Sequence, residues 1–188
     1  LIGPEDIKEE DIRSHQVAYL EGYLWDNEKA KQAMKKMIDI CKADQQKIAF
    51  TLSDLFCVDR HRETYKNLIE NDVDILFGNN DEFSAMVNST NSEDGVAYAK
   101  SLNILSILTM GNKGSLIIQG DKILEIKAEP VSKVIDTTGA GDLFAAGFLF
   151  GFTHEKSMEE CGRFASIASA EIISHYGARP KVKLSSLV

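Results

Sequence analysis

The sequence has little of several residues that mark special classes of protein. It contains three cysteines and three prolines among 188 residues, and Cys41, Cys57 and Cys161 stand far apart. No Cys-x-x-Cys or Cys/His cluster occurs, so neither a disulfide framework nor a zinc site is supported. The prolines stand only at positions 4, 130 and 180, and nothing indicates a hinge between domains.

Positive charge is scarce, and so are long apolar runs. The formal net charge is −8, which argues against a nucleic-acid partner, because nucleic-acid-binding proteins usually carry a basic face. The negative net charge does not exclude anionic small substrates, since a few backbone amides can bind a phosphate. The longest apolar run, residues 143–152, has about half the length of a membrane span, and no signal peptide precedes it. We therefore expect a cytoplasmic protein without a membrane partner.

What the sequence does contain is an alternation of strand and helix patterns typical of a globular protein. The expected strands and helices of the first part are 17–20, 27–43, 47–52, 59–71, 73–77, 80–88, 93–102 and 104–109. This alternation predicts a mostly parallel sheet with helices on both faces. We expect a single α/β domain over residues 1–188.

The pattern changes in the second part. Residues 115–119 and 122–127 flank Gly120-Asp121, which is a strong hairpin signal. A short strand is expected at 133–135. Two apolar, largely buried helices are expected at about 141–153 and 157–175.

The most informative segment runs from Val134 to Phe144 and contains two aspartates, two threonines and two glycines within seven residues. Gly139 and Gly141 allow the backbone to bend sharply and to approach a ligand closely. The amides at the start of the following helix would form an anion hole, with Asp142 beside it. In this position Asp142 can accept a proton from a substrate hydroxyl while the amides bind a transferring phosphoryl group. The alternative is that Asp136 and Asp142 only cap a tight turn.

The segment Asp136-Thr137-Thr138-Gly139-Ala140-Gly141-Asp142 resembles the second signature of the ribokinase-like (PfkB-type) carbohydrate kinases. Two further elements agree with that family in order and spacing: Asn79-Asn80-Asp81-Glu82, and Thr109-Met110-Gly111-Asn112-Lys113-Gly114. The resemblance implies a three-layer αβα ribokinase-like fold. It covers only the C-terminal part of a typical member, so the N-terminal strands and the lid are expected to be missing.

The resemblance also implies roles for individual residues. Asp142 would be the catalytic base, and Gly139, Ala140 and Gly141 would supply the anion hole. The nucleotide-binding residues would be Asn79, Thr109, Gly111 and Gly114, with Ser166 at a position that often carries Asn beside the adenine. Glu82 would act on Mg²⁺ through water, and Asp136 and Thr138 resemble ligands of a monovalent cation. The implied cofactors are ATP and Mg²⁺, with K⁺ as a further candidate.

Several alternatives stay open at this point. Without the family, Glu82 could equally begin a solvated helix, and residues 109–114 could be a plain strand–turn–strand. Phe144 and Trp25 are better explained as packing residues. A dinucleotide-dependent oxidoreductase is disfavoured, because no Gly-x-Gly-x-x-Gly follows a first strand.

The expected reaction is transfer of the γ-phosphoryl group of ATP to an alcohol of a small-molecule acceptor. Phe77-Gly78-Asn79 and Leu52 to Cys57 are similar to adenosine kinases, so a nucleoside acceptor is favoured over the sugar of a fructokinase or ribokinase. The chain begins with Leu1 and not with Met, which suggests a fragment. A third reading is therefore a kinase fragment that binds nucleotide without catalysis. A homodimer is a candidate assembly.

Overall fold

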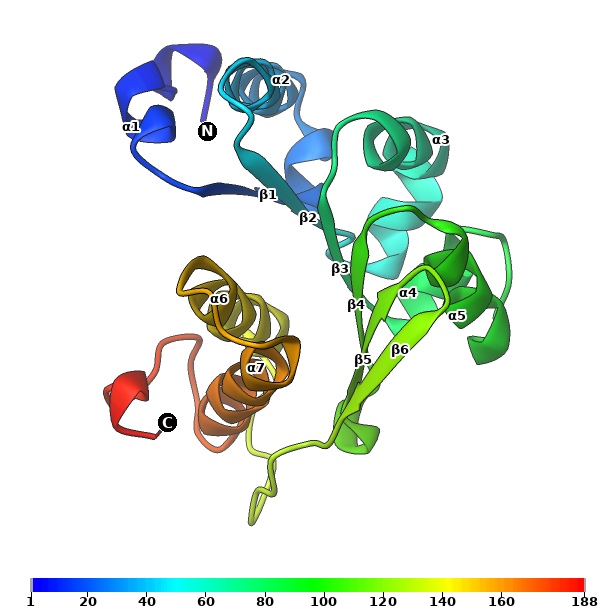
Figure 1. Ribbon diagram of the computed structural model, residues 1–188, viewed down its shortest axis with the longest axis vertical. Coiled ribbons are helices and arrows are strands. Elements are labelled where there is room, and N and C mark those ends of the chain that lie inside the picture. Colours follow the sequence, from blue (N-terminus) through cyan, green and yellow to red (C-terminus); the bar gives the residue numbers. More distant parts are fainter. Residues whose placement is uncertain (1, 188) are drawn as a thin grey trace. The chain divides into compact units, whose positions relative to one another are not determined.

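A computed structural model describes residues 2–187 (Figure 1). The strands are β1 Val17–Glu21, β2 Lys47–Thr51, β3 Ile75–Asn79, β4 Leu105–Thr109, β5 Ser115–Gln119 and β6 Lys122–Ile126. The α-helices are α1 Glu9–Arg13, α2 Glu28–Ala43, α3 Leu55–Asn71, α4 Asn80–Ala85, α5 Ser92–Ser101, α6 Ala140–Thr153 and α7 Met158–Ile173. Short 3-10 helices are η1 Pro4–Asp6, η2 Gly22–Asp26, η3 Gly111–Lys113 and η4 Leu184–Ser186.

The strands form one sheet in the order in which they occur in the chain, from β1 to β6. The pairs β1–β2 and β2–β3 are parallel, with Val17 opposite Lys47 and Ala49 opposite Ile75. Helices connect the first four strands, whereas β4, β5 and β6 are joined by the short segments 110–114 and 120–121. Links this short reverse the direction of the chain, since a parallel crossover needs a dozen or more residues. The sheet is mostly parallel, and the predicted hairpin is confirmed.

The chain divides into two compact units. The first unit comprises the residues up to Leu108 together with Ile118–Lys122, and the second comprises Thr109–Ile117 and the residues from Ile123 onward. The prediction of a single domain over residues 1–188 stays a prediction.

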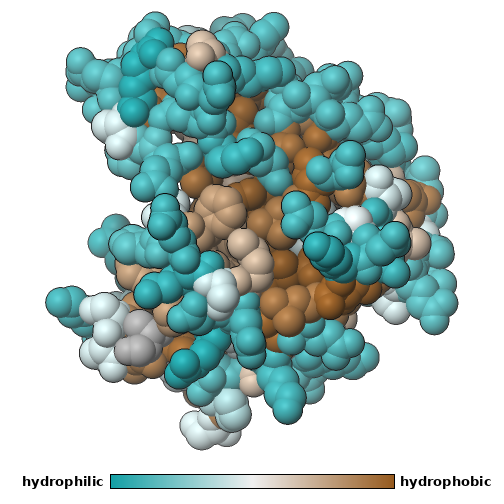
Figure 2. Space-filling view, viewed as in Figure 1, coloured by the Kyte–Doolittle hydropathy of each residue, from teal (hydrophilic) through white to brown (hydrophobic). Residues whose placement is uncertain are grey.

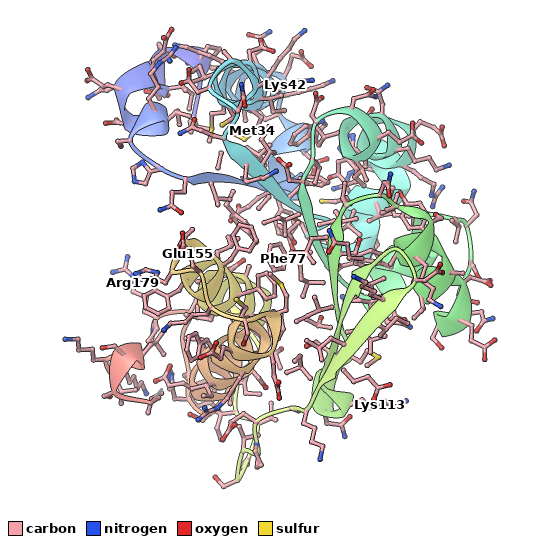
Figure 3. All side chains as sticks on the ribbon, in the orientation of Figure 1. Met34, Lys42, Phe77, Lys113, Glu155 and Arg179 are labelled. Carbon is pink, nitrogen blue, oxygen red and sulfur yellow. The ribbon has the colours of Figure 1, made fainter. Side chains whose placement is uncertain are left out.

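Amphipathic helices cover the first unit. α2 begins at Asn27, whose side chain accepts hydrogen bonds from the N–H groups of Lys29 and Ala30 at 3.0 and 3.1 Å. Met34 is buried on this helix, whereas Lys42 is exposed near its end (Figure 3). The outward surface of α2 is accordingly hydrophilic, at the top of the view in Figure 2.

An aromatic cluster forms part of the core of the first unit. The ring centroids of Phe50 and Tyr65 lie 5.0 Å apart, and those of Trp25 and Phe50 lie 5.5 Å apart, both in edge-to-face contact. The hydroxyl of the buried Tyr65 donates to the carbonyl oxygen of Gly22 at 2.9 Å. Trp25 is buried, so its prediction as a packing residue is confirmed.

Glycines allow the helices of the second unit to pack closely. A Cβ on Gly147 of α6 would lie 2.6 Å from the carbonyl oxygen of Phe164 in α7. A Cβ on Gly162 would lie 2.5 Å from Cγ1 of Ile126, so α7 also packs against β6. The two predicted helices are present, but Phe150 of α6 is 47% exposed, so this helix is less buried than predicted.

Two local predictions are wrong. Residues 133–135 do not form a strand, because the N–H of Ile135 donates to the carbonyl of Ile173, at the end of α7, at 2.8 Å. The helix predicted at 59–71 begins earlier, at Leu55, because the side chain of Asp54 accepts from the N–H of Cys57 at 2.6 Å and caps it.

Over residues 2–187, no helix has both the length and the apolar character needed to cross a bilayer.

Candidate active site

The turn that leads into α6 contains the glycine-rich motif. Gly139 has φ +81°, in the left-handed region that a residue with a side chain adopts only with strain. A Cβ there would also lie 3.2 Å from Cβ of Ala178. The N–H of Ala140 donates to the carbonyl of Thr137 at 3.1 Å and closes the turn. Glycine at position 139 therefore allows the left-handed turn after which α6 begins at Ala140.

The first turn of α6 leaves backbone donors open. Gly139 has no side chain that could cap the helix, and the amides of Gly141 and Asp142 have no carbonyl partner four residues earlier within the helix. A Cβ on Gly141 would meet no atom within 4 Å. Because the N–H of Ala140 is already used in the turn, Gly141 and Asp142 are the helical residues whose amides stay available for an anion.

Asp142 is exposed in this first turn, next to the open amides. An ionised carboxylate beside donors that can bind a phosphoryl group is suited to general-base chemistry on an alcohol. This arrangement is compatible with the role predicted for Asp142, which stays a prediction.

Asp136 and Thr138 are joined by hydrogen bonds. One carboxylate oxygen of Asp136 accepts from the N–H and the hydroxyl of Thr138, at 2.9 and 2.7 Å, and the other accepts from the N–H of Gly177 at 3.1 Å. These bonds, those to Thr138 first, hold the pKa of the Asp136 carboxyl below its usual range. The two residues predicted to bind a monovalent cation thus lie together, where the turn before α6 meets the loop after α7.

A cavity of about 560 Å³ lies within the second unit. It brings together six of the predicted site residues, Thr109, Gly111, Gly114, Ala140, Gly141 and Ser166. The remaining lining residues are Asn112, Ala128, Glu129, Pro130, Val131, Val134, Thr137, Phe144, Ser169, Ala170 and Ile173. Its size suits a nucleotide-sized ligand, and its wall includes the open start of α6.

The turn between β4 and β5 forms one wall of this cavity. Gly114 has φ +91°, and a Cβ there would lie 2.0 Å from the carbonyl oxygen of Ile126, so only glycine fits. The N–H of Met110 donates to the carbonyl of Gly114 at 2.8 Å and closes the turn. Lys113 is exposed on the same turn (Figure 3). The turn joins two strands, which was the alternative interpretation of residues 109–114, and it also lines the cavity.

Ser166 forms hydrogen bonds to the segment that makes up another wall of the cavity. Its hydroxyl accepts from the N–H of Glu129 at 2.7 Å and donates to the carbonyl of Lys127 at 3.2 Å. Both functions of the hydroxyl are therefore used to hold the segment that follows β6. This role differs from the adenine contact that the family resemblance associates with the position.

In the first unit, Asn79 and Glu82 form a capping box at the start of α4. The side chain of Asn79 accepts from the N–H of Glu82 at 2.9 Å, and the Glu82 carboxylate accepts from the N–H and the side-chain amide of Asn79, at 3.0 and 2.6 Å. Glu82 is 6% exposed, so it does not begin a solvated helix. Burial, opposed by the bond from Asn79, raises the pKa of Glu82 to about 7.

Neither predicted metal site is a closed side-chain cage. Among residues 2–187, no group of three or more His, Cys, Asp or Glu side chains could hold a metal ion. The two oxygens of Glu82 accept from the N–H and the side-chain amide of Asn79, and the action of Glu82 on Mg²⁺ through water stays a prediction. Asn79 and Glu82 belong to the first unit, and the other predicted site residues belong to the second.

Several cavity residues were not predicted as site residues. Pro130, Val131, Val134 and Ile173 are apolar wall residues, and only their position around the motif could have suggested them. Phe144 is buried, which confirms its prediction as a packing residue, and it is also part of the cavity wall.

Comparison with known proteins identifies the family. The pfkB family of carbohydrate kinases matches residues 3–184, so the chain belongs to this family. A probable sugar kinase from Rhizobium etli has a structure with TM-score 0.96 and 36% identity, over 99% of this chain and 57% of its own. Adenosine kinase from Sinorhizobium meliloti has TM-score 0.94 and 37% identity, with the same coverage of both chains.

A more distant structure carries ligands. A candidate ribokinase II from E. coli, crystallised with ATP and Mg²⁺, has TM-score 0.85 and 19% identity over 98% of this chain and 61% of its own. These likenesses confirm the ribokinase-like α/β fold. The chain spans less than two thirds of the length of the structures it matches.

Proposed function

We propose that this chain carries the nucleotide-binding and catalytic part of an ATP-dependent kinase that phosphorylates an alcohol of a nucleoside or sugar. The observation that carries the proposal is the start of α6. There, open amides, a left-handed glycine and an exposed Asp142 stand beside a cavity of about 560 Å³.

Each part has a chemical task in this reaction. The amides of Gly141 and Asp142 would bind the phosphoryl group, because a helix start offers donors and a favourable dipole to an anion. Asp142 would orient the acceptor hydroxyl and accept its proton as the oxygen attacks the γ-phosphorus, while the bond from that phosphorus to the bridging oxygen breaks and ADP leaves. No enzyme nucleophile is needed, since the hydroxyl oxygen attacks directly. The cavity would hold the nucleotide, with the turn 111–114 and the segment near Glu129 as its walls.

The residues present fit ATP and Mg²⁺. The open amides of α6 are suited to a phosphate, and the buried Glu82, whose pKa is about 7, could orient water around a metal ion. When bound, Mg²⁺ would neutralise charge on the triphosphate. Asp136 and Thr138 would help to bind a monovalent cation that orders the turn before α6.

The acceptor is the less constrained part of the proposal. The likeness to the adenosine kinase from Sinorhizobium meliloti supports a nucleoside. A sugar is the second candidate, supported by a nearly equal likeness to the probable sugar kinase from Rhizobium etli. This chain covers 57% of each relative, so 43% of each relative has no counterpart here, and we assign acceptor contacts to that part.

The test is an assay of ADP release with ATP and Mg²⁺ and with adenosine, ribose or fructose as acceptor. It uses the natural protein that carries these 188 residues, in KCl, in NaCl and in a bulky organic cation salt. We expect acceptor-dependent ADP release that is highest with adenosine and a few-fold higher in KCl. ATP binding without turnover for any acceptor would instead support a non-catalytic nucleotide-binding protein. Equal rates in all three salts, with Asp136→Ala harmless, would remove the cation site.

A further inference from the structure

The loop after α7, residues 174–181, contacts the turn that begins α6. The N–H of Gly177 in this loop donates to the carboxylate of Asp136 at 3.1 Å. A Cβ on Gly139 would lie 3.2 Å from Cβ of Ala178, so the loop also touches the left-handed residue of the turn. Arg179 belongs to the same loop (Figure 3). The position of the α6 start therefore depends on where this loop is held.

Glu171, near the end of α7, holds the loop from both sides. One oxygen of its carboxylate, Oε1, accepts from Nε2 of His175 at 3.0 Å and from the N–H of Lys181 at 2.9 Å. The side chains of Glu171 and His175 are only 9% and 11% exposed. A single carboxylate oxygen thus joins the two ends of the loop to α7.

Stability alone is a poor explanation for this carboxylate. Its second oxygen, Oε2, is buried and has no hydrogen-bond partner among residues 2–187. A buried acceptor without a partner lowers stability, and an apolar residue would avoid that cost. Buried charged groups can instead fix one conformation out of several.

We infer that Glu171 is a positioning residue for the phosphoryl-transfer site, an inference that rests on the proposed function. It fixes the loop 174–181, the loop fixes Asp136 and Gly139, and these two fix the first turn of α6. Glu171 is not among the residues that line the cavity. It acts by holding the open amides and Asp142 in one geometry, and a displacement of about 1 Å in such a site can cost a hundredfold in rate.

The test compares Glu171→Ala and Glu171→Gln with a matched control, Glu160→Ala. Glu160 lies at the other end of α7, where its carboxylate accepts from the N–H and the hydroxyl of Ser157, at 2.9 and 2.8 Å. Its loss should destabilise the same helix without reaching the α6 turn. Three quantities are measured for each variant: the thermal midpoint, the hydrogen exchange of the amides in 137–142, and the kcat and KM of phosphoryl transfer.

For Glu171→Ala we expect faster exchange at 137–142 and a kcat lowered by about tenfold to a hundredfold, with a smaller change in the KM for ATP. Glu171→Gln should recover most of the kcat, because both hydrogen bonds end on one oxygen that Gln retains. Glu160→Ala should lower the midpoint and leave the exchange at 137–142 and kcat as in wild type. If Glu171→Ala does not fold, His175→Ala removes one of the two contacts and takes its place.

A purely structural Glu171 would give a different result. Glu171→Ala would then lose thermal stability like Glu160→Ala, with unchanged exchange at 137–142 and unchanged kcat, and the inference would be overturned. Asp142→Asn serves as a reference in the same assay. If wild type shows no phosphoryl transfer, or transfer that survives Asp142→Asn, the proposed function fails, while the exchange measurement still decides whether Glu171 fixes the turn.

Discussion

Helices α4 and α6 each have an acidic residue at the third helical position, but the surroundings of these two acids differ. In α4 the capping residue is Asn79 and the acid is Glu82, and each satisfies the other's backbone N–H. In α6 the capping position is Gly139, which has no side chain, and the acid is Asp142. Glu82 is buried in its box, whereas Asp142 is exposed.

The difference shows that an acid at the third position can stand either in a closed capping box or beside open amides. An acid at the third position ordinarily completes a capping box, as Glu160 also does with Ser157 at the start of α7. Replacing the capping side chain by glycine in the left-handed conformation leaves the amides of the first turn open. Glycine in place of a capping side chain costs roughly a few tenths of a kcal/mol, and the open amides are the donors that we propose for an anion.

The largest effect that the comparison predicts is on catalysis. Asp142→Asn keeps the shape of the side chain and removes its basicity, so kcat should fall by about 10² to 10⁴-fold while ATP affinity stays within a few-fold. Steady-state kinetics and a nucleotide-binding titration measure the two quantities. Glu160→Gln, at the equivalent position of α7, is the matched control and should leave kcat unchanged. Activity of Asp142→Asn within a few-fold of wild type would remove the assignment of the base.

The second prediction concerns the buried acid of α4. Folding raises the pKa of Glu82 from 4.5 to about 7, so the folded state binds the proton more tightly than the unfolded state does. The free energy of unfolding of wild type, relative to Glu82→Gln, should therefore fall as pH rises from about 4.5 to 7, by up to about 3 kcal/mol, and level off above that.

Urea unfolding of both proteins at several pH values measures this difference. Glu160→Gln again serves as the control, because hydrogen bonds from Ser157 hold the pKa of Glu160 below its usual range. Its difference from wild type should stay flat between pH 5 and 7. A flat curve for Glu82→Gln as well would show that burial does not perturb Glu82.

The smallest expected effect on stability is that of Gly141→Ala, a variant for which we expect stability and kcat to change in opposite directions. Gly141 is an exposed helical position where a Cβ meets no atom within 4 Å, so Gly141→Ala should stabilise the protein by about 0.5–1 kcal/mol. The added methyl group would crowd the amide that is proposed to bind the phosphoryl group, so kcat should fall. Denaturant unfolding and steady-state kinetics on one preparation measure both. A variant that is more stable and fully active would show that the open amide is not used.

Local patterns in the sequence predict much of the fold and the central motif. The strands β1 to β6 and the helices α2, α6 and α7 follow from apolar spacing and from turn residues such as Gly120-Asp121. The ribokinase-like fold and the family are confirmed by comparison, and they follow from the motifs at 79–82, 109–114 and 136–142. These features can be predicted because each depends on residues close together in the chain.

Tertiary structure decided what depends on residues far apart. The segment 133–135 has the β-branched residues of a strand, yet its N–H at Ile135 bonds to Ile173, thirty-eight positions away in the chain. The hydroxyl of Ser166 is committed to Lys127 and Glu129, and the burial that raises the pKa of Glu82 comes from the packing around α4. Hydrogen-bond partners and local dielectric are properties of the folded surroundings, so no spacing rule along the chain contains them.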